Sequence, residues 1–166
     1  MKLTDQLTPH FRAWELAQHD GGVRTLPTDP ELLDNLQKTA EMAEVVRVRW
    51  ALKCPDPRLT VISGYRSDEQ NARIGGAKLS QHKLAKAVDI VRADIDWDAL
   101  RHGTGTEVDA DKMQDFVETI EKLIDHGELS MVGGFGIYPG WVHLDWRPRL
   151  GVKVARWFGA TIGSEQ

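Results

Sequence analysis

Cysteine is almost absent from this sequence, which excludes a fold held together by disulfides. Cys54 is the single cysteine among 166 residues, and we expect it to be a small hydrophobe that follows a helix. Runs of basic residues are absent too. The chain has 21 Lys and Arg and 25 Asp and Glu, which gives a net charge of −4. Without a basic cluster to follow a phosphate backbone, nucleic acid is not an expected partner.

Long hydrophobic runs are also missing. Stretches such as Val45-Val46 and 50–52 are interrupted by arginines, so no membrane insertion is expected. The N-terminal segment MKLTDQLTPHFRAWEL has no apolar core of signal-peptide length followed by a small-residue cleavage site. These absences predict a chain that is synthesised in the cytoplasm without a signal peptide.

Length and composition predict one domain over residues 1–166. A chain of this length with 41% hydrophobic residues can bury about two thirds of its unfolded surface around one core. The sequence contains no internal repeat and no low-complexity segment. No exposed apolar stripe that would suit a subunit interface stands out in the sequence either, so a monomer is the default expectation.

Two amphipathic helices are expected to supply much of the core. Asp29 before Pro30 predicts a helix start, and this helix should run to about residue 53, where prolines follow. A second helix is expected over about 111–126, with Gly127 as its C-terminal cap. The apolar residues that recur at helical spacing are Leu33, Leu36, Ala40, Ala43, Val46 and Trp50 in the first, and Met113, Phe116, Val117, Ile120, Leu123 and Ile124 in the second.

The remaining elements are shorter and alternate with loops. The glycine-rich segment 133–136 precedes a strand and lacks a following lysine or serine, so we interpret it as a turn and not as a phosphate loop. The expected elements are a buried strand over 59–63, a short helix from Ser67 closed by Gly75 and Gly76, a strand over 87–91, an exposed acidic insertion over 94–111, and two strands between Gly134 and Trp146 that turn at Pro139-Gly140.

Three residues distant in sequence suggest a metal site: His82, Asp89 and His143. Two imidazoles and one carboxylate are a common ligand set for catalytic zinc, which leaves a fourth position for a water that the metal acidifies. Asp89 lies between Val88 and Ile90, and a carboxylate on a buried strand needs a cationic partner. Taken one at a time, Asp89 also fits a pair with an arginine, and His82 fits an ordinary loop histidine.

The strand around His143 separates two kinds of side chain. Because strand side chains alternate, Trp141, His143 and Asp145 should share one face of it. The opposite face carries Val142, Leu144 and Trp146, which would anchor the strand in the core. A solvent-exposed edge strand would alternate in the same way. Trp141 fits either the core or the wall of a cleft, where it would bind substrate by stacking on a peptide or a sugar.

The sequence resembles the M15 zinc peptidases, the group of D-alanyl-D-alanine carboxypeptidases and related peptidoglycan endopeptidases. The likeness rests on three motifs in order: SGYRS at 63–67, SQH at 80–82 followed by Asp89, and VHLD at 142–145. The segment HFRAWEL at 10–16 is similar to the opening of the small subgroup whose third motif is HxD. The resemblance implies an α+β, hedgehog-like fold in which a small, mostly antiparallel sheet is backed by helices and carries the zinc site in a cleft.

The same resemblance implies roles for individual residues. It makes His82, Asp89 and His143 the ligands of a Zn²⁺ cofactor. It makes Arg66 a catalytic and substrate-binding residue that holds a substrate carboxylate or the developing oxyanion, which suits a planar guanidinium. It places Ser80 in the same pocket. A surface salt bridge is the alternative for Arg66.

Two positions depart from the family pattern. Many relatives have Glu or Asp three residues before the third ligand, where this sequence has Gly140. Asp145 is the best substitute as catalytic general base, although it could instead orient a ligand histidine. Ala85 stands where the family usually has glycine, and we expect the loop to follow a different path because alanine disfavours a positive φ.

The functional hypothesis is a zinc peptidase that hydrolyses peptidoglycan stem or cross-link peptides next to a D-amino acid by metal-activated water. Its expected partners are peptidoglycan peptides, and its expected place of action is the bacterial cell wall, as a phage or prophage lysis enzyme. The alternative is a non-catalytic, zinc-containing module for cell-wall binding or phage structure. We expect the cations of the C-terminal segment to form a solvated rim, with contact to an anionic polymer as the alternative: Arg147, Arg149, Lys153 and Arg156.

Overall fold

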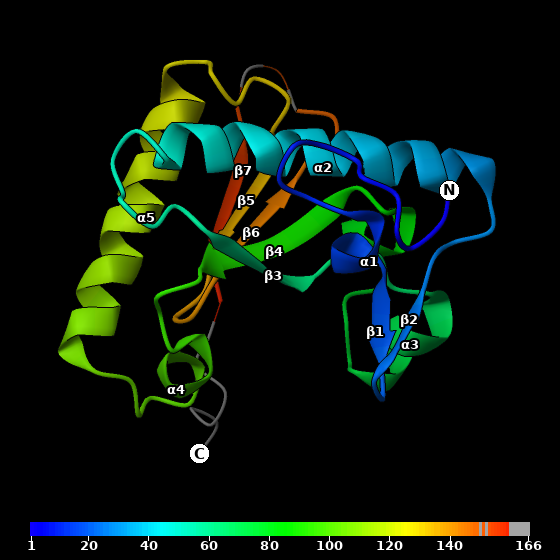
Figure 1. Ribbon diagram of the computed structural model, residues 1–166, viewed down its shortest axis with the longest axis horizontal. Helices are drawn as coiled ribbons and strands as arrows, with labels where there is room; N and C mark the ends of the chain where they lie inside the picture. Colours follow the sequence, from blue (N-terminus) through cyan, green and yellow to red (C-terminus); the bar gives the residue numbers. More distant parts are fainter. Residues whose placement is uncertain (150, 152, 160–166) are drawn as a thin grey trace.

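The computed structural model in Figure 1 describes residues 1–149, 151 and 153–159. Within these residues the chain forms a five-stranded sheet, a separate two-stranded hairpin and helices packed around them, which confirms the α+β class. The elements in chain order are α1 (Ala13–Leu16), β1 (Gln18–Asp20), β2 (Val23–Thr25), α2 (Pro30–Trp50), β3 (Leu59–Ser63), α3 (Asp68–Arg73), the 3₁₀ helix η1 (Gln81–Leu84), β4 (Ala87–Arg92), α4 (Trp97–Arg101), α5 (Glu107–Asp125), β5 (Gly134–Ile137), β6 (Val142–Asp145) and β7 (Ala155–Phe158).

The five-stranded sheet has the strand order β3-β4-β6-β5-β7. Its first three pairings are antiparallel, and only β5 and β7 run parallel, so the mostly antiparallel sheet expected from the sequence is confirmed. The register places Asp89 of β4 opposite His143 of β6, and Gly134 of β5 opposite Asp145 of β6. Pairing between neighbouring strands therefore brings distant segments of the chain to the same part of the sheet.

Helix α2 begins as the sequence predicts and lies across the five-stranded sheet (Figure 1). The Asp29 side chain accepts a hydrogen bond from the backbone N–H of Glu31 at 2.8 Å, and Pro30 occupies the first turn. The helix ends at Trp50, three residues before the expected position, because residues 51–53 form a turn. Its predicted apolar stripe is buried from Leu36 onward, while Leu33 is half-buried.

Helix α5 begins four residues earlier than expected, and the acidic segment before it is ordered. The Thr106 hydroxyl accepts a hydrogen bond from the N–H of Asp109 at 3.1 Å and so starts the helix. The segment 94–111 is mostly exposed, as expected, and Ile95 is its one buried residue. It also contains the unpredicted helix α4, whose Asp96 cap accepts from the N–H of Ala99 at 3.0 Å.

The core lies between the sheet and the two long helices. The Trp50 ring of α2 meets the Phe116 ring of α5 edge to face, with centroids 5.3 Å apart. Ile90 of β4 and Leu144 of β6 are fully buried in the same cluster, and burial of such a side chain contributes about 1.5–3 kcal/mol. All six predicted apolar residues of α5 are buried, so the periodicity in the sequence identified this face correctly.

The short helix α3 confirms half of its predicted cap. The Ser67 hydroxyl accepts from the N–H of Gln70 at 3.2 Å, but the Gln70 side chain donates to the carbonyl of His19 at 2.6 Å instead of returning to Ser67. This contact joins α3 to the β1–β2 hairpin, and the two lie together at one end of the molecule in Figure 1. Gly75 then ends the segment with a φ of +68°.

Several elements were not predicted from the sequence. They are α1, the β1–β2 hairpin, η1, α4 and the edge strand β7. Segment 133–136 was interpreted as a turn, but all of it except Gly133 belongs to β5. Among the described helices, none combines the length and hydropathy needed to cross a membrane.

Candidate metal centre and its cleft

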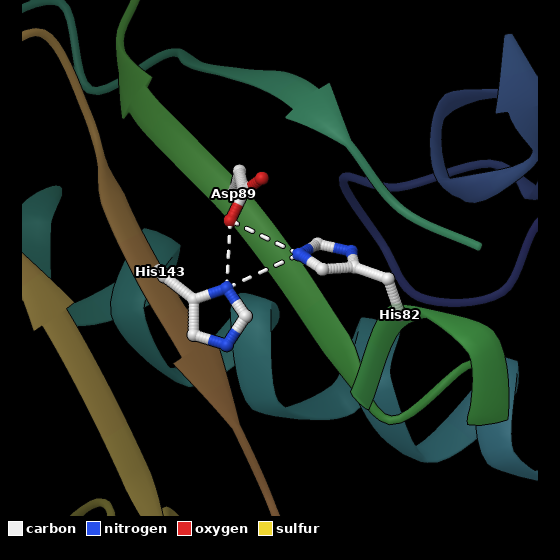
Figure 2. Close-up of side chains that lie close together, drawn as sticks. All are labelled: His82, Asp89 and His143. Atoms are coloured by element: carbon white, nitrogen blue, oxygen red, sulfur yellow. Dashed lines mark hydrogen bonds and ion pairs between the residues drawn. The ribbon is translucent and has the colours of Figure 1, made fainter. Parts of the chain in front are cut away.

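Three elements bring His82, Asp89 and His143 together. His82 projects from η1, Asp89 from β4 and His143 from β6, and Figure 2 shows their polar ends directed at one point. The antiparallel register of β4 and β6 sets Asp89 and His143 opposite each other. All three are buried, with 3%, 5% and 7% of their surface exposed. The sequence hypothesis named these three residues, and the structure places them in one cluster.

Three atoms of this cluster form a small triangle. Nε2 of His82 lies 3.2 Å from Oδ1 of Asp89 and 3.1 Å from Nδ1 of His143. Nδ1 of His143 lies 2.8 Å from the same carboxylate oxygen. Each residue therefore contributes one atom that lies close to the contributed atoms of the other two, as ligands around a single ion do.

Hydrogen bonds on the outer side of each imidazole fix which nitrogen faces the triangle. Nδ1 of His82 lies 2.6 Å from the carbonyl oxygen of Gly64, which can only accept, so this nitrogen carries the proton and donates. Nε2 of His143 lies 3.1 Å from Oδ2 of Asp145 and donates to that carboxylate. When both rings are neutral, as imidazoles that bind a metal are, these outer protons leave the lone pairs of His82 Nε2 and His143 Nδ1 facing the triangle.

The carboxyl of Asp89 is held in its charged form within the cluster. Burial opposes ionisation of Asp89, but His82 and His143 outweigh it and hold the pKa of that carboxyl well below its usual range. Burial lowers the pKa of His82 below its usual value. Burial also disfavours a charged His143, yet hydrogen bonds to Asp145 and Asp89 raise its pKa to about 9. A bound metal cation would replace the positive charge that this imidazole otherwise supplies.

This donor set fits zinc. Two imidazole nitrogens and one carboxylate oxygen are ligands that Zn²⁺ accepts, and atoms bound tetrahedrally to it lie roughly 3.3–3.5 Å from one another. The observed separations of 2.8–3.2 Å are shorter by a few tenths of an ångström. Both imidazoles also have the outer hydrogen-bond partners that hold histidine ligands in place in metal sites. His82, Asp89 and His143 can therefore hold a metal ion together.

The loop after His82 contains a left-handed residue that is not glycine. Ala85 has a φ of +52°, so alanine adopts here the positive φ that it usually disfavours. Two polar side chains of α2 hold the loop in place. The Thr39 hydroxyl donates to the carbonyl of Ala85 at 2.7 Å, and the Asn35 amide donates to the carbonyl of Leu84 at 3.0 Å. These contacts offset the strain at Ala85.

Asp145 lies behind His143 and is fully buried. Besides His143, its carboxylate accepts from Nε of Arg147 at 2.8 and 2.9 Å, from Nη2 at 2.5 Å and from the Arg147 backbone N–H at 3.0 Å. Burial opposes the charge, but the bonds from His143 and Arg147 lower the pKa of Asp145 to about 2. Asp145 is therefore a charged partner of one imidazole and one guanidinium.

Arg66 lies on the other side of the cluster. Its Nη2 lies 2.9 Å from Oδ2 of Asp89, the carboxylate oxygen that does not face the histidines. Its Nε donates to the Ser63 hydroxyl at 2.8 Å, and its backbone N–H donates to the carbonyl of His82 at 3.1 Å. Arg66 thus contacts two members of the triangle, and its side chain is 18% exposed. The salt bridge considered for it is formed with Asp89 and not at the surface.

A cavity of about 620 Å³ opens over the cluster. Ser80 and Trp141, the two further residues predicted to bind substrate, both line it. The Trp141 ring is stacked on Tyr138 with centroids 4.8 Å apart and meets the Trp97 ring edge to face at 6.4 Å. Trp141 therefore packs against its neighbours and also forms part of the wall. The lining residues that carry the argument are Arg66, Ser80, Trp141, Arg147 and Trp157, beside the three that form the triangle.

Gly140, the position at which many relatives have an acidic residue, has no room for a side chain. A Cβ there would lie 2.3 Å from the backbone carbonyl oxygen of Trp97 in α4. Among the described residues that line the cavity, Asp89 is the only acidic one. The packing of α4 against the β5–β6 turn therefore requires glycine at position 140 and excludes an acidic side chain there.

Arg147 and Trp157 belong to the site but were not predicted to. Arg147 was assigned to a solvated rim, yet it binds Asp145 and lines the cavity. The spacing of His143, Asp145 and Arg147 in steps of two is the signal that would have identified it. Trp157 lies on β7, with its ring centroid 5.3 Å from that of His143, and no local sequence pattern predicted this contact.

Comparison with known proteins supplies the family. The model of the family described as Peptidase M15 matches residues 9–109, more than half of the 166 residues. This stretch includes Arg66, His82 and Asp89, whereas His143 lies beyond it. No curated protein matches the chain. The chain belongs to the M15 peptidase family, whose members are metallopeptidases.

Proposed function

We propose that the protein is a zinc-dependent peptidase that hydrolyses peptidoglycan stem or cross-link peptides next to a D-amino acid. The observation that carries the proposal is the buried triangle of two imidazole nitrogens and one carboxylate oxygen, with separations of 2.8–3.2 Å. Membership of the M15 family supports the peptidase activity. Since peptidoglycan forms the bacterial cell wall, the proposed activity belongs there.

His82, Asp89 and His143 would hold the metal. Zinc bound there would supply a water of lowered pKa and would polarise the scissile carbonyl. The contributions of the protein are the fixed imidazole tautomers and the burial of the ligands. Both keep the ligand atoms in position before metal or substrate arrives, so little reorganisation is needed.

Arg66 is the proposed electrostatic partner of the substrate. Its guanidinium has five N–H donors, of which Ser63 and Asp89 engage those on Nε and Nη2. The remaining donors are available for a substrate carboxylate or for the oxyanion that develops during hydrolysis. Ser80 and Trp141 line the same cavity and are proposed to contact the peptide. We also propose that the fold of the protein is hedgehog-like.

Of the two roles considered for Asp145, orientation of His143 fits its contacts better. A general base must reach the proton that it removes. Asp145 is 0% exposed, and both of its oxygens are bound by Arg147, one of them by His143 as well. A carboxylate on the outer nitrogen of an imidazole ligand fixes the ring orientation and increases its basicity. We therefore propose Asp145 as a positioning residue.

A second candidate function is a non-catalytic module that binds zinc and cell-wall peptides. The observation that favours it is Gly140, because the packing against Trp97 excludes the carboxylate that many relatives have there. The same cavity and the same three ligands would then bind a peptide without cleaving it. A digestion experiment distinguishes the two functions, because only a peptidase cleaves the peptide that it binds.

The test is digestion of purified muropeptides with zinc-loaded protein, with chelator-treated protein and with the chelated protein after zinc is restored. Mass spectrometry of the products distinguishes loss of one amino acid from separation of two stems. We expect cleavage that chelation abolishes and zinc restores. His143→Ala should be inactive, whereas His126→Ala, which removes an exposed histidine at the end of α5, should cleave normally. A protein that binds zinc and muropeptides but leaves them intact would instead establish the binding module.

A further inference from the structure

In a chain of net charge −4, the cavity over the metal ligands contains two arginines, each of which pairs with one aspartate: Arg66 with Asp89 and Arg147 with Asp145. Arg66 and Arg147 both line it. The only acidic residue among its described lining residues is Asp89, which Arg66 already pairs with. A metal ion held by the triangle would add further positive charge. Anionic groups are therefore favoured in this cavity although the surface as a whole is acidic.

Arg147 is held in place before any ligand binds. Asp145 accepts from its Nε and Nη2, and its guanidinium carbon lies 5.2 Å from the ring centroid of Trp157. The indole N–H of Trp157 in turn donates to the hydroxyl of Tyr138 at 3.1 Å. The Arg147 side chain is 35% exposed. A guanidinium fixed on two sides and open on another loses little conformational freedom when it binds an anion.

The two arginines lie at opposite ends of one chain of contacts. Arg66 contacts Asp89, Asp89 contacts His143, His143 contacts Asp145, and Asp145 contacts Arg147. The metal-binding triangle includes the middle of this chain. A peptide that lies over the triangle can therefore reach both guanidiniums, because both line the same cavity.

We propose that the cavity recognises peptides that carry two carboxylates, one on each side of the bond that is cut, through Arg66 and Arg147. Arg147 is the new anion-binding residue. This inference rests on the proposed peptidase function and names the substrate class of the same site. Each pair is a charge-assisted, planar contact between guanidinium and carboxylate, which is stronger than a hydrogen bond between neutral groups.

The test compares four forms of one synthetic stem peptide. The parent carries the free α-carboxylate of a γ-linked D-glutamyl residue and a free C-terminal carboxylate, and the others have one or both converted to carboxamides. Binding is measured by calorimetry and cleavage by kcat/KM with mass-spectrometric detection. Both are measured for the wild type, Arg147→Gln, Arg147→Lys and Arg156→Gln. Arg156 is the matched control because it is an exposed arginine beside Trp157 that pairs with Asp125 and does not line the cavity.

For the wild type, we expect each amidation to weaken binding and kcat/KM by about 10- to 100-fold. Arg147→Gln should lose the preference for one of the two carboxylates and keep the preference for the other. Arg147→Lys should keep part of it because the charge remains. Arg156→Gln should behave as the wild type. Zinc content measured for each variant shows whether the loss of the Asp145 partner has disturbed the metal ligands.

The outcomes separate this inference from the proposed function. Cleavage of all four peptides with equal kcat/KM would overturn the two-carboxylate inference while the peptidase function stands. Preferential binding of the diacid without cleavage of any peptide would overturn the peptidase function while the recognition stands. If zinc-loaded wild type and Arg147→Gln discriminate equally between the carboxylate and carboxamide peptides, Arg147 does not bind a substrate carboxylate.

Discussion

Gly134 faces Asp145 across strands β5 and β6, and the carboxylate of Asp145 occupies the space where a side chain at position 134 would begin. A Cβ on Gly134 would lie 2.4 Å from Oδ2 and 2.7 Å from Oδ1 of Asp145. The same Oδ2 accepts from Nε2 of His143. The absence of a side chain at position 134 therefore allows the contact between Asp145 and His143, which lie two positions apart on β6.

Gly134→Ala should weaken metal binding. The added methyl group would displace the Asp145 carboxylate from His143, and loss of such an outer partner reduces metal affinity by about 10- to 100-fold. The measurement is the zinc dissociation constant from competition with a chromophoric chelator. His126→Ala serves as the control because this exposed histidine lies outside the triangle. Unchanged zinc affinity in Gly134→Ala would show that Asp145 does not orient His143.

A side chain at Gly140 should destabilise the fold instead of providing a base. A Cβ at this position would lie 2.3 Å from the backbone carbonyl oxygen of Trp97, so Gly140→Ala forces α4 or the β5–β6 turn to move. Overpacking of this kind costs about 1–3 kcal/mol, and Gly140→Glu should cost more. The measurement is the free energy of unfolding in urea. Gain of peptidase activity by Gly140→Glu without loss of stability would contradict this interpretation.

The atom that obstructs position 140 belongs to the backbone, which provides a control. Trp97→Ala leaves that carbonyl in place, so it should not rescue Gly140→Ala. Because the two positions are in contact, their losses of unfolding free energy need not add, but the double variant should be no more stable than Gly140→Ala alone. A double variant that is more stable than Gly140→Ala would mean that the Trp97 ring, and not its carbonyl, excludes the side chain.

Much of the fold could be predicted because local patterns dictate it. The cap at Asp29 and the apolar periodicities of α2 and α5 indicated both long helices, and β-branched runs indicated β3 and β4. The expected turn at Pro139-Gly140 separates β5 and β6. By contrast, β7 pairs in parallel with β5 across an intervening segment of the chain, and its four residues carry no strong strand pattern. Pairing between distant segments is what the sequence did not reveal.

The three residues of the triangle could be identified from residue type and motif order, but their surroundings could not. Nδ1 of His82 donates to the backbone carbonyl of Gly64, and no side-chain pattern predicts a bond to backbone. The space left by Gly134 and the contact of Trp157 with His143 both depend on strand register. Arg147 was within reach of prediction, because it continues the two-residue spacing of His143 and Asp145 just beyond the end of β6.

Metal binding should stabilise the folded protein. The triangle exists only when η1, β4 and β6 are folded together, so zinc binds the native state in preference to the unfolded state. Free zinc at about 100 times its dissociation constant should raise the free energy of unfolding by about 2.7 kcal/mol. The measurement is urea unfolding with zinc and with chelator. His82→Ala should lose this increment and His126→Ala should keep it, and an equal increment in both would place the zinc elsewhere.

Glu44 should make stability depend on pH in the acidic range. Burial opposes its charge, but hydrogen bonds from His10 and Thr8 lower its pKa from 4.5. Its contribution is therefore complete above that value and is lost as the pH falls through the lowered pKa. Glu44→Gln should cost about 1 kcal/mol at neutral pH and progressively less as the pH falls below 4.5, measured by urea unfolding. Glu41→Gln, an exposed change on the same helix, should show no such trend, and a pH-independent loss in Glu44→Gln would contradict this linkage.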